Sequence, residues 1–184
     1  LGTENVIKSC LQYKVSKMVL LSTDKAVYPI NAMGLTKALG EKILTSYAKF
    51  IDSSKLNLCA TRYGNVMCSR GSVIPLFISQ ILNKKNITIT DPQMTRFLMS
   101  LEEAVSLVKY AFTNASQGEI FIKKAPACNI KTLANALLDI FNAENKIEII
   151  GSRHGEKIYG SLLSREEMSR ASDLNDYYSI PLDS

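Results

Sequence analysis

The chain has 184 residues, of which 46% are hydrophobic and 21% are charged, and its formal net charge is +5. This length and composition predict a globular domain with a sizeable core and exclude a disordered or repetitive chain. The positive charge suits an anionic ligand, but no basic stripe with interleaved aromatic residues is present, so we do not expect nucleic-acid binding.

The sequence also argues against a secreted or membrane-spanning protein. It shows no signal peptide and no apolar stretch long enough to span a bilayer. The four cysteines (Cys10, Cys59, Cys68 and Cys128) form no C-x-x-C pair and lie among apolar residues. We therefore expect reduced, buried cysteines in a cytoplasmic protein.

The first elements are a helix and a strand. Thr3 can cap a helix that carries Val6, Ile7 and other apolar residues on one face and ends near Lys14. The apolar run 18–21 is flanked by polar segments, which predicts a parallel strand buried on both faces.

Polar residues follow this strand directly. Thr23, Asp24 and Lys25 place a hydroxyl, an acid and a base where chemistry gathers in open α/β sheets, at the carboxyl end of a strand. A surface ion pair is the alternative interpretation of Asp24 and Lys25. A helix then begins at Asn31 and runs to about Phe50, and Met33 and Lys37 share one of its faces.

The remaining elements continue the alternation. The sequence predicts strands at 56–61, 87–89, 119–122 and 147–150, and helices in 71–84, from 101 to before Gly118, and over 130–141. Such β-α-β order predicts an α/β fold with a doubly wound parallel sheet and right-handed crossovers.

Three further segments carry candidate binding residues. Asn65 follows a strand, where it is either a ligand-binding residue or a turn former. Arg96 lies among apolar residues and needs an anion, either a phosphate or a nearby carboxylate. Arg153 and Glu156 flank His154, the only histidine, which we interpret as a loop residue; one histidine cannot make a metal site, so none is expected.

The run from Ser22 to Lys37 (STDKAVYPINAMGLTK) resembles the extended short-chain dehydrogenase/reductases that modify nucleotide sugars. It is most similar to the CapD/CapE-like polysaccharide biosynthesis group of nucleotide-sugar dehydratases and epimerases. The resemblance returns, in order, at 62–66 (RYGNV), 71–77 (GSVIPLF), 94–97 (MTRF) and 153–157 (RHGEK).

The resemblance implies that the chain is the C-terminal part of a longer enzyme. It would lack the N-terminal half of a Rossmann domain, because no glycine-rich turn such as G-x-G-x-x-G is present. Residues 1–62 and 97–124 would form the rest of the NAD(P)-binding domain. Residues 63–96 and 125–184 would form a smaller α/β nucleotide-sugar-binding region. The fragment alone is expected to be inactive.

The resemblance also implies roles for single residues. Most of the superfamily uses a Tyr-x-x-x-Lys pair with NAD or NADP, but here only Lys37 matches it, because Met33 stands at the tyrosine position, as in the CapE-like enzymes. The catalytic residues would be Thr23, Asp24, Lys25, Met33 and Lys37. The cofactor would be held by Ser22, Lys37 and Tyr63, and the substrate by Asn65, Val73, Arg96, Arg153 and Glu156.

Three functions remain open at this stage. The Asp24–Lys25 pair favours a UDP-N-acetylglucosamine 4,6-dehydratase, with or without inversion at C5, because elimination needs an extra acid and base. The alternative is a 4-epimerase of UDP-glucose or UDP-N-acetylglucosamine. A non-catalytic nucleotide-binding fragment is the third. The implied partners are a UDP-sugar and further copies of the chain, in surface polysaccharide synthesis.

Overall fold

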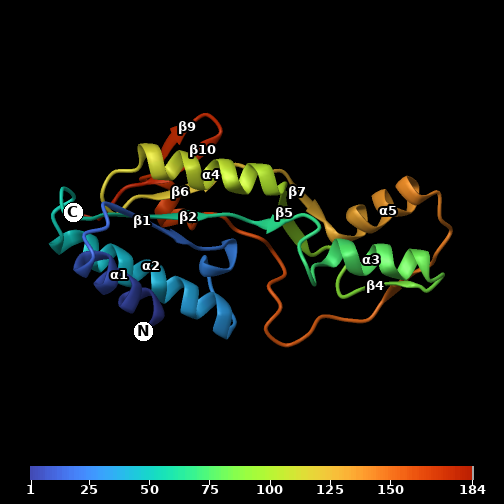
Figure 1. Cartoon of the computed structure of the whole chain (residues 1–184). Coiled ribbons are helices and arrows are strands. Elements are labelled where there is room, and N and C mark those ends of the chain that lie inside the picture. Colours follow the sequence, from blue (N-terminus) through green and yellow to red (C-terminus); the bar gives the residue numbers. More distant parts are fainter. Residues whose placement is uncertain (184) are drawn as a thin grey trace. The chain divides into compact units, whose positions relative to one another are not determined.

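The structure is a computed structural model that describes residues 1–183. The chain divides into two compact units (Figure 1), each described by itself. The first contains Leu1–Tyr63, Glu102–Lys124 and the described chain from Ser161 onward. The second contains Gly64–Leu101 and Ala125–Gly160. The predicted division differs in three places: Tyr63 and residues 161–183 lie in the first unit, and residues 97–101 lie in the second. The functional roles of the units stay a prediction.

The first unit is built on a five-stranded sheet with the order β1-β2-β6-β10-β9. Strands β1, β2 and β6 are parallel to one another, whereas β10 is antiparallel to β6 and β9 is antiparallel to β10. The strands are β1 (Lys17–Leu21), β2 (Asn57–Arg62), β6 (Ile120–Lys123), β9 (Ser172–Leu174) and β10 (Tyr177–Ile180). The α/β class is as predicted, but the two antiparallel strands were not predicted.

Helices cover both faces of this sheet. Figure 1 shows α1 (Gly2–Gln12) and α2 (Ala32–Phe50) on one face and α4 (Leu101–Asn114) on the other. Cys59 of β2 and Phe121 of β6 pack against Leu107 and Ala111 of α4. A short 3₁₀ helix, η1 (Asp24–Ala26), and α6 (Arg165–Met168) complete the unit.

Two expectations for this unit were wrong, and the expectation that the cysteines of the chain are buried was wrong in part. Thr3 lies inside α1, whose N-cap is Leu1, because the helix starts earlier than the capping signal indicated. The residues of β1 are only partly buried, and Leu21 is exposed, because this strand lies at the edge of the sheet. Cys59 is buried, but Cys68 is exposed in a turn with φ 57°; all four cysteines are free thiols.

The second unit holds two small sheets and two helices. The sheets have the orders β3-β5-β7 and β4-β8. Their core contains Ile74 and Phe77 of one helix together with Leu133 and Leu137 of the other. The elements are β3 (Asn65–Val66), α3 (Val73–Leu82), β4 (Ile87–Ile89), β5 (Thr95–Met99), β7 (Ala127–Asn129), α5 (Ile130–Phe141) and β8 (Ile147–Ile149).

Candidate functional site

The polar residues after β1 form a compact cluster. Thr23 caps η1, and its hydroxyl donates to Asp24 Oδ1 at 2.9 Å. The Lys25 ammonium donates to the same oxygen at 3.0 Å. The side chain of Asp24 is 2% exposed and that of Lys25 is 29% exposed. The Asp24 and Lys25 pair is therefore not the surface ion pair of the alternative interpretation.

Two hydrogen bonds hold this cluster against neighbouring elements. The backbone N–H of Asp24 donates to the Tyr63 carbonyl at 3.0 Å, which extends the pairing of β1 and β2 beyond the strands. The Lys37 ammonium donates to the Leu21 carbonyl at 2.9 Å, so α2 directs this lysine to the carboxyl end of β1. The structure thus brings Lys37 to the strand end that carries Thr23 and Asp24.

Met33 and Ser22 differ in their surroundings. Met33 is 46% exposed in the first turn of α2, where its thioether has no proton to give or take at neutral pH. Ser22 is buried, and its hydroxyl donates to a carboxylate oxygen of Glu41. The Ser22 side chain is therefore committed to the protein interior, which argues against a direct contact with a cofactor.

A buried ionic network lies behind this strand end, and sequence reasoning missed it. Arg62 Nε and Nη2 donate to Glu41, Nη1 and Nη2 donate to Glu167, and Nη1 donates to the Leu162 carbonyl. Burial by itself lowers the pKa of Arg62, but the bonds to Glu41 and Glu167 outweigh it, so the pKa is raised. The available signal was Arg62 itself, which follows the predicted strand 56–61, because a buried guanidinium requires anionic partners such as carboxylates.

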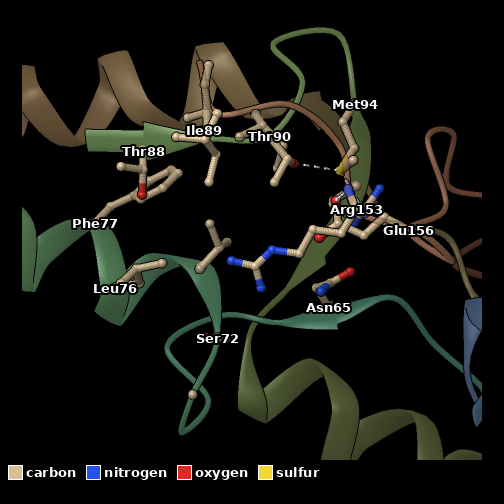
Figure 2. Close-up of a pocket in the computed structure, with 15 residues that line it drawn as sticks. Asn65, Ser72, Leu76, Phe77, Thr88, Ile89, Thr90, Met94, Arg153 and Glu156 are labelled. Carbon is tan, nitrogen blue, oxygen red and sulfur yellow. Dashed lines mark hydrogen bonds between the residues drawn. The ribbon is translucent and has the colours of Figure 1, made fainter. Parts of the chain in front are cut away.

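The five residues predicted to bind substrate line one pocket of the second unit. Its volume is about 310 Å³, and Asn65, Val73, Arg96, Arg153 and Glu156 all belong to its wall. Figure 2 shows the Arg153 side chain extending into this pocket, with Leu76 and Asn65 on either side in this view. Apolar and hydroxyl-bearing side chains complete it, including Leu76, Phe77, Thr88, Ile89, Thr90, Met94, Ile130 and Ile150.

The two arginines of the pocket differ in their bonding. Arg96 donates to its neighbouring Thr95 carbonyl at 2.7 Å and lies 2.8 Å from the Met94 sulfur, so its guanidinium is held by the protein. Within residues 1–183 the Arg153 guanidinium has no hydrogen bond or ion pair. Its backbone N–H donates to Glu156 Oε2 at 3.1 Å, which fixes the loop that carries it. Arg153 is therefore the pocket cation available to an anion.

Two buried polar atoms of the pocket also lack partners. Within the described chain, neither Asn65 Oδ1 nor Ser72 Oγ makes a hydrogen bond. Buried polar atoms without partners are uncommon in proteins and mark places where a ligand or water can bind. Ser72, the N-cap residue of α3, is a pocket residue that the sequence analysis did not name.

The matching family is described as polysaccharide biosynthesis protein, and it matches residues 1–182. The chain belongs to this family. Its relatives include proteins named UDP-glucose 4-epimerase from Rickettsia rickettsii (strain Sheila Smith) and Rickettsia massiliae (strain Mtu5). These are 61% and 60% identical over 183 residues. Each match covers 100% of this chain and 54% of the relative, so the chain spans about half the length of these family members.

Solved structures agree with this membership. The X-ray structure of Pen from Bacillus thuringiensis is 42% identical with a TM-score of 0.93, covering 98% of this chain and 57% of that one. DesIV from Streptomyces venezuelae, a dTDP-glucose 4,6-dehydratase solved with NAD, has a TM-score of 0.79 at 19% identity, over 91% of this chain and 57% of its own. The latter similarity shows the fold: a Rossmann-like α/β architecture.

The described residues contain neither a group of metal ligands nor a membrane-spanning helix. Among residues 1–183, no three His, Cys, Asp or Glu side chains are grouped as metal ligands would be. Over the same residues, no helix combines the length and the apolar character that crossing a bilayer requires.

Proposed function

We propose that the protein containing this chain is a UDP-N-acetylglucosamine 4,6-dehydratase that works through a 4-keto intermediate. The observation that carries the proposal is the Asp24–Lys25 pair at the carboxyl end of β1, joined there by Thr23 and Lys37. Oxidation at C4 makes the C5 proton acidic, and elimination then needs a base at C5 and a proton donor for the C6 oxygen. Lys25 is the proposed base, acting as its neutral amine, and Asp24 is the proposed proton source.

The pocket of the second unit supports a nucleotide diphosphate as the carrier of the sugar. The Arg153 guanidinium can donate two parallel hydrogen bonds to phosphate oxygens. The Glu156 carboxylate can accept from a ribose hydroxyl, and the apolar wall around Leu76 and Phe77 can cover a base. We assign nucleotide recognition to this pocket and ring chemistry to the cluster after β1.

The residues present fit one end of a nicotinamide dinucleotide. The Lys37 ammonium uses one of its three N–H groups on the Leu21 carbonyl and has no other partner in the described chain, so it can bind a ribose hydroxyl. Tyr63 lies beside Asp24 through its backbone carbonyl. When bound, NAD or NADP supplies the hydride acceptor. Homo-oligomer formation stays a prediction.

A second candidate is a 4-epimerase, which is favoured by the name UDP-glucose 4-epimerase that the 61% identical relative carries. An epimerase returns the hydride to C4 and leaves C5 and C6 unchanged. It therefore has no use for an additional acid and base at the ring. The Asp24–Lys25 pair is the reason for placing dehydration first.

Proton NMR in deuterated water tests both candidates on the full-length protein that contains this chain. With UDP-N-acetylglucosamine, a dehydratase gives a new C6 methyl signal and deuterium at C5. A product that is inverted at C4 and keeps its C6 oxygen, formed from UDP-glucose or from UDP-N-acetylglucosamine, would favour the epimerase. No turnover of either sugar would leave a non-catalytic nucleotide-binding role. Lys25→Met should abolish the methyl signal, whereas Lys49→Met, at an exposed position late in α2, should not.

A further inference from the structure

The Asp24 carboxylate is covered by its own neighbours. Its side chain is 2% exposed, and one of its oxygens accepts from both the Thr23 hydroxyl and the Lys25 ammonium. A carboxylate in this position cannot exchange a proton with a sugar by direct contact. Any proton that reaches it has to pass through a group that is both bonded to it and partly exposed. Thr23 and Lys25 meet both conditions, and Lys25 is the base assigned to C5, which leaves Thr23.

The Thr23 hydroxyl has the bonding pattern of a relay. A hydroxyl has one donor and two acceptor positions. Its donor is directed at Asp24 Oδ1 at 2.9 Å, and one acceptor position receives the Lys25 backbone N–H at 3.4 Å. One acceptor position remains, so the oxygen can accept a hydrogen bond from an incoming hydroxyl while its own proton points to Asp24.

Met33 and Lys37 cannot take a proton from a sugar hydroxyl, and Lys25 is the base already assigned to C5. The Met33 thioether is not a proton acceptor of useful strength, and the Lys37 ammonium, which donates to the Leu21 carbonyl, has no free lone pair. Oxidation at C4 nevertheless requires that the hydroxyl lose its proton. Thr23 and Asp24 together provide a path for that proton.

We propose that Thr23 and Asp24 form a two-step proton relay that serves as the base for oxidation of the sugar hydroxyl; this rests on the proposed function. The hydroxyl proton moves to Thr23 Oγ1 as the Thr23 proton moves to Asp24 Oδ1. The hydride of the same carbon goes to the oxidised nicotinamide cofactor, and a C=O bond replaces the C–O single bond. The carboxylate ends as a carboxylic acid, and Thr23 is unchanged.

The relay also closes the proton balance of dehydration. The net reaction releases one water, made from the C6 hydroxyl and one proton. The C4 hydrogen ends at C6. Lys25 takes one proton from C5 and returns one to C5 after exchange with the solvent, so these two transfers cancel. The proton stored on Asp24 is therefore the one that leaves with the C6 hydroxyl, through Thr23 in the reverse direction. Asp24 needs no direct contact with the substrate in either step.

The test uses matched replacements of Thr23 in the full-length protein with bound cofactor. Thr23→Ser keeps the N-cap of η1 and the relay, whereas Thr23→Asn keeps a capping acceptor without a hydroxyl proton. We expect Thr23→Asn and Thr23→Val to slow reduction of the cofactor by UDP-N-acetylglucosamine about 100-fold, the lower range of general-base effects. Thr23→Ser should retain most of the rate. The dissociation constant of UDP, measured by calorimetry, should stay unchanged in all three.

A double-mutant cycle separates a relay from two independent roles. If Thr23 and Asp24 act in series, Thr23→Val combined with Asp24→Asn should be no slower than the slower single variant. Rate losses that multiply would overturn the relay, as would a Thr23→Val enzyme with the wild-type oxidation rate. If the wild-type protein does not reduce its cofactor with UDP-N-acetylglucosamine or with UDP-glucose, the proposed function is refuted, and the relay with it. Thermal unfolding of each variant identifies any that fails to fold.

Discussion

Arg62 and Glu41 form a doubly hydrogen-bonded ion pair inside the first unit, with Arg62 Nε and Nη2 at 3.1 and 2.6 Å from the two carboxylate oxygens. The remaining N–H groups of the guanidinium bind Glu167 and the Leu162 carbonyl. Ser22, the residue before Thr23, donates to Glu41. The network thus joins the end of β1, the helix α2 and the segment that contains α6.

Removing Arg62 should destabilise the protein strongly. Arg62→Met leaves the buried Glu41 and the partly buried Glu167 without their cation, and removing one partner of a buried pair costs about 3–5 kcal/mol. Urea unfolding measures the change in the free energy of unfolding. The control is Lys8→Met, which breaks the exposed pair with Glu4 in α1 and should change stability little. Equal effects of the two substitutions would contradict this prediction.

The same network should make stability depend on pH through Glu167. Burial raises the pKa of its carboxyl, but hydrogen bonds from Arg62 and the charge of Arg62 outweigh it, so the pKa is lowered. A carboxyl with a lowered pKa in the folded state stabilises the fold above its unfolded pKa of about 4.3. That stabilisation is lost as the pH falls from there through the folded pKa.

Unfolding free energies measured from neutral to acidic pH test this dependence. Glu167→Gln should be less stable than the wild type at neutral pH. The difference between the two proteins should shrink as the solution is acidified through and below pH 4.3. A constant difference over the whole range would show that Glu167 contributes by packing and not by its charge.

The regular elements could be predicted from sequence because their periodicity is local. The predicted strand at 87–89 and helix at 130–141 coincide with β4 and α5. The network around Arg62 could not be predicted, since it joins residues as far apart as Glu41 and Glu167 and nothing in the sequence states which carboxylate meets which cation. Likewise, β9 and β10 are short and carry polar residues, so they lack the apolar alternation that identifies a strand.

The residues of the candidate site were accessible to sequence reasoning, but their bonding was not. Thr23, Asp24 and Lys25 are adjacent in the chain, so any fold places them together. That Asp24 lies beneath the other two depends on three-dimensional packing. Similarly, the sequence suggested both Arg96 and Arg153 as anion-binding residues. Only the structure distinguishes Arg96, which is held by the Thr95 carbonyl and the Met94 sulfur, from Arg153, which extends into the pocket (Figure 2).

Arg153 should contribute more to UDP binding than any other cation near the pocket. A charge-assisted hydrogen bond contributes about 1.5–3 kcal/mol, so Arg153→Ala should weaken UDP binding roughly 10- to 100-fold. Titration calorimetry with UDP measures the effect, which should decrease at high salt. Arg70→Ala removes an exposed arginine that does not line the pocket and should leave the affinity unchanged. Equal loss in both variants would indicate non-specific charge attraction.

Gly34 lets the first turn of α2 approach the backbone of η1. A Cβ atom at Gly34 would overlap with the carbonyl oxygen of Lys25 and lie 3.2 Å from Pro29 Cβ. Since the first of these is a backbone atom, Gly34→Ala should cost about 1–3 kcal/mol of stability and displace the Lys25 main chain. The rate at which the full-length protein oxidises the sugar hydroxyl should therefore fall even in molecules that remain folded. The control is Gly2→Ala in α1 of the same unit, where the added Cβ would have no atom within 4 Å and should cost no stability. If both variants lowered the unfolding midpoint equally, the close approach of α2 to Lys25 would be contradicted.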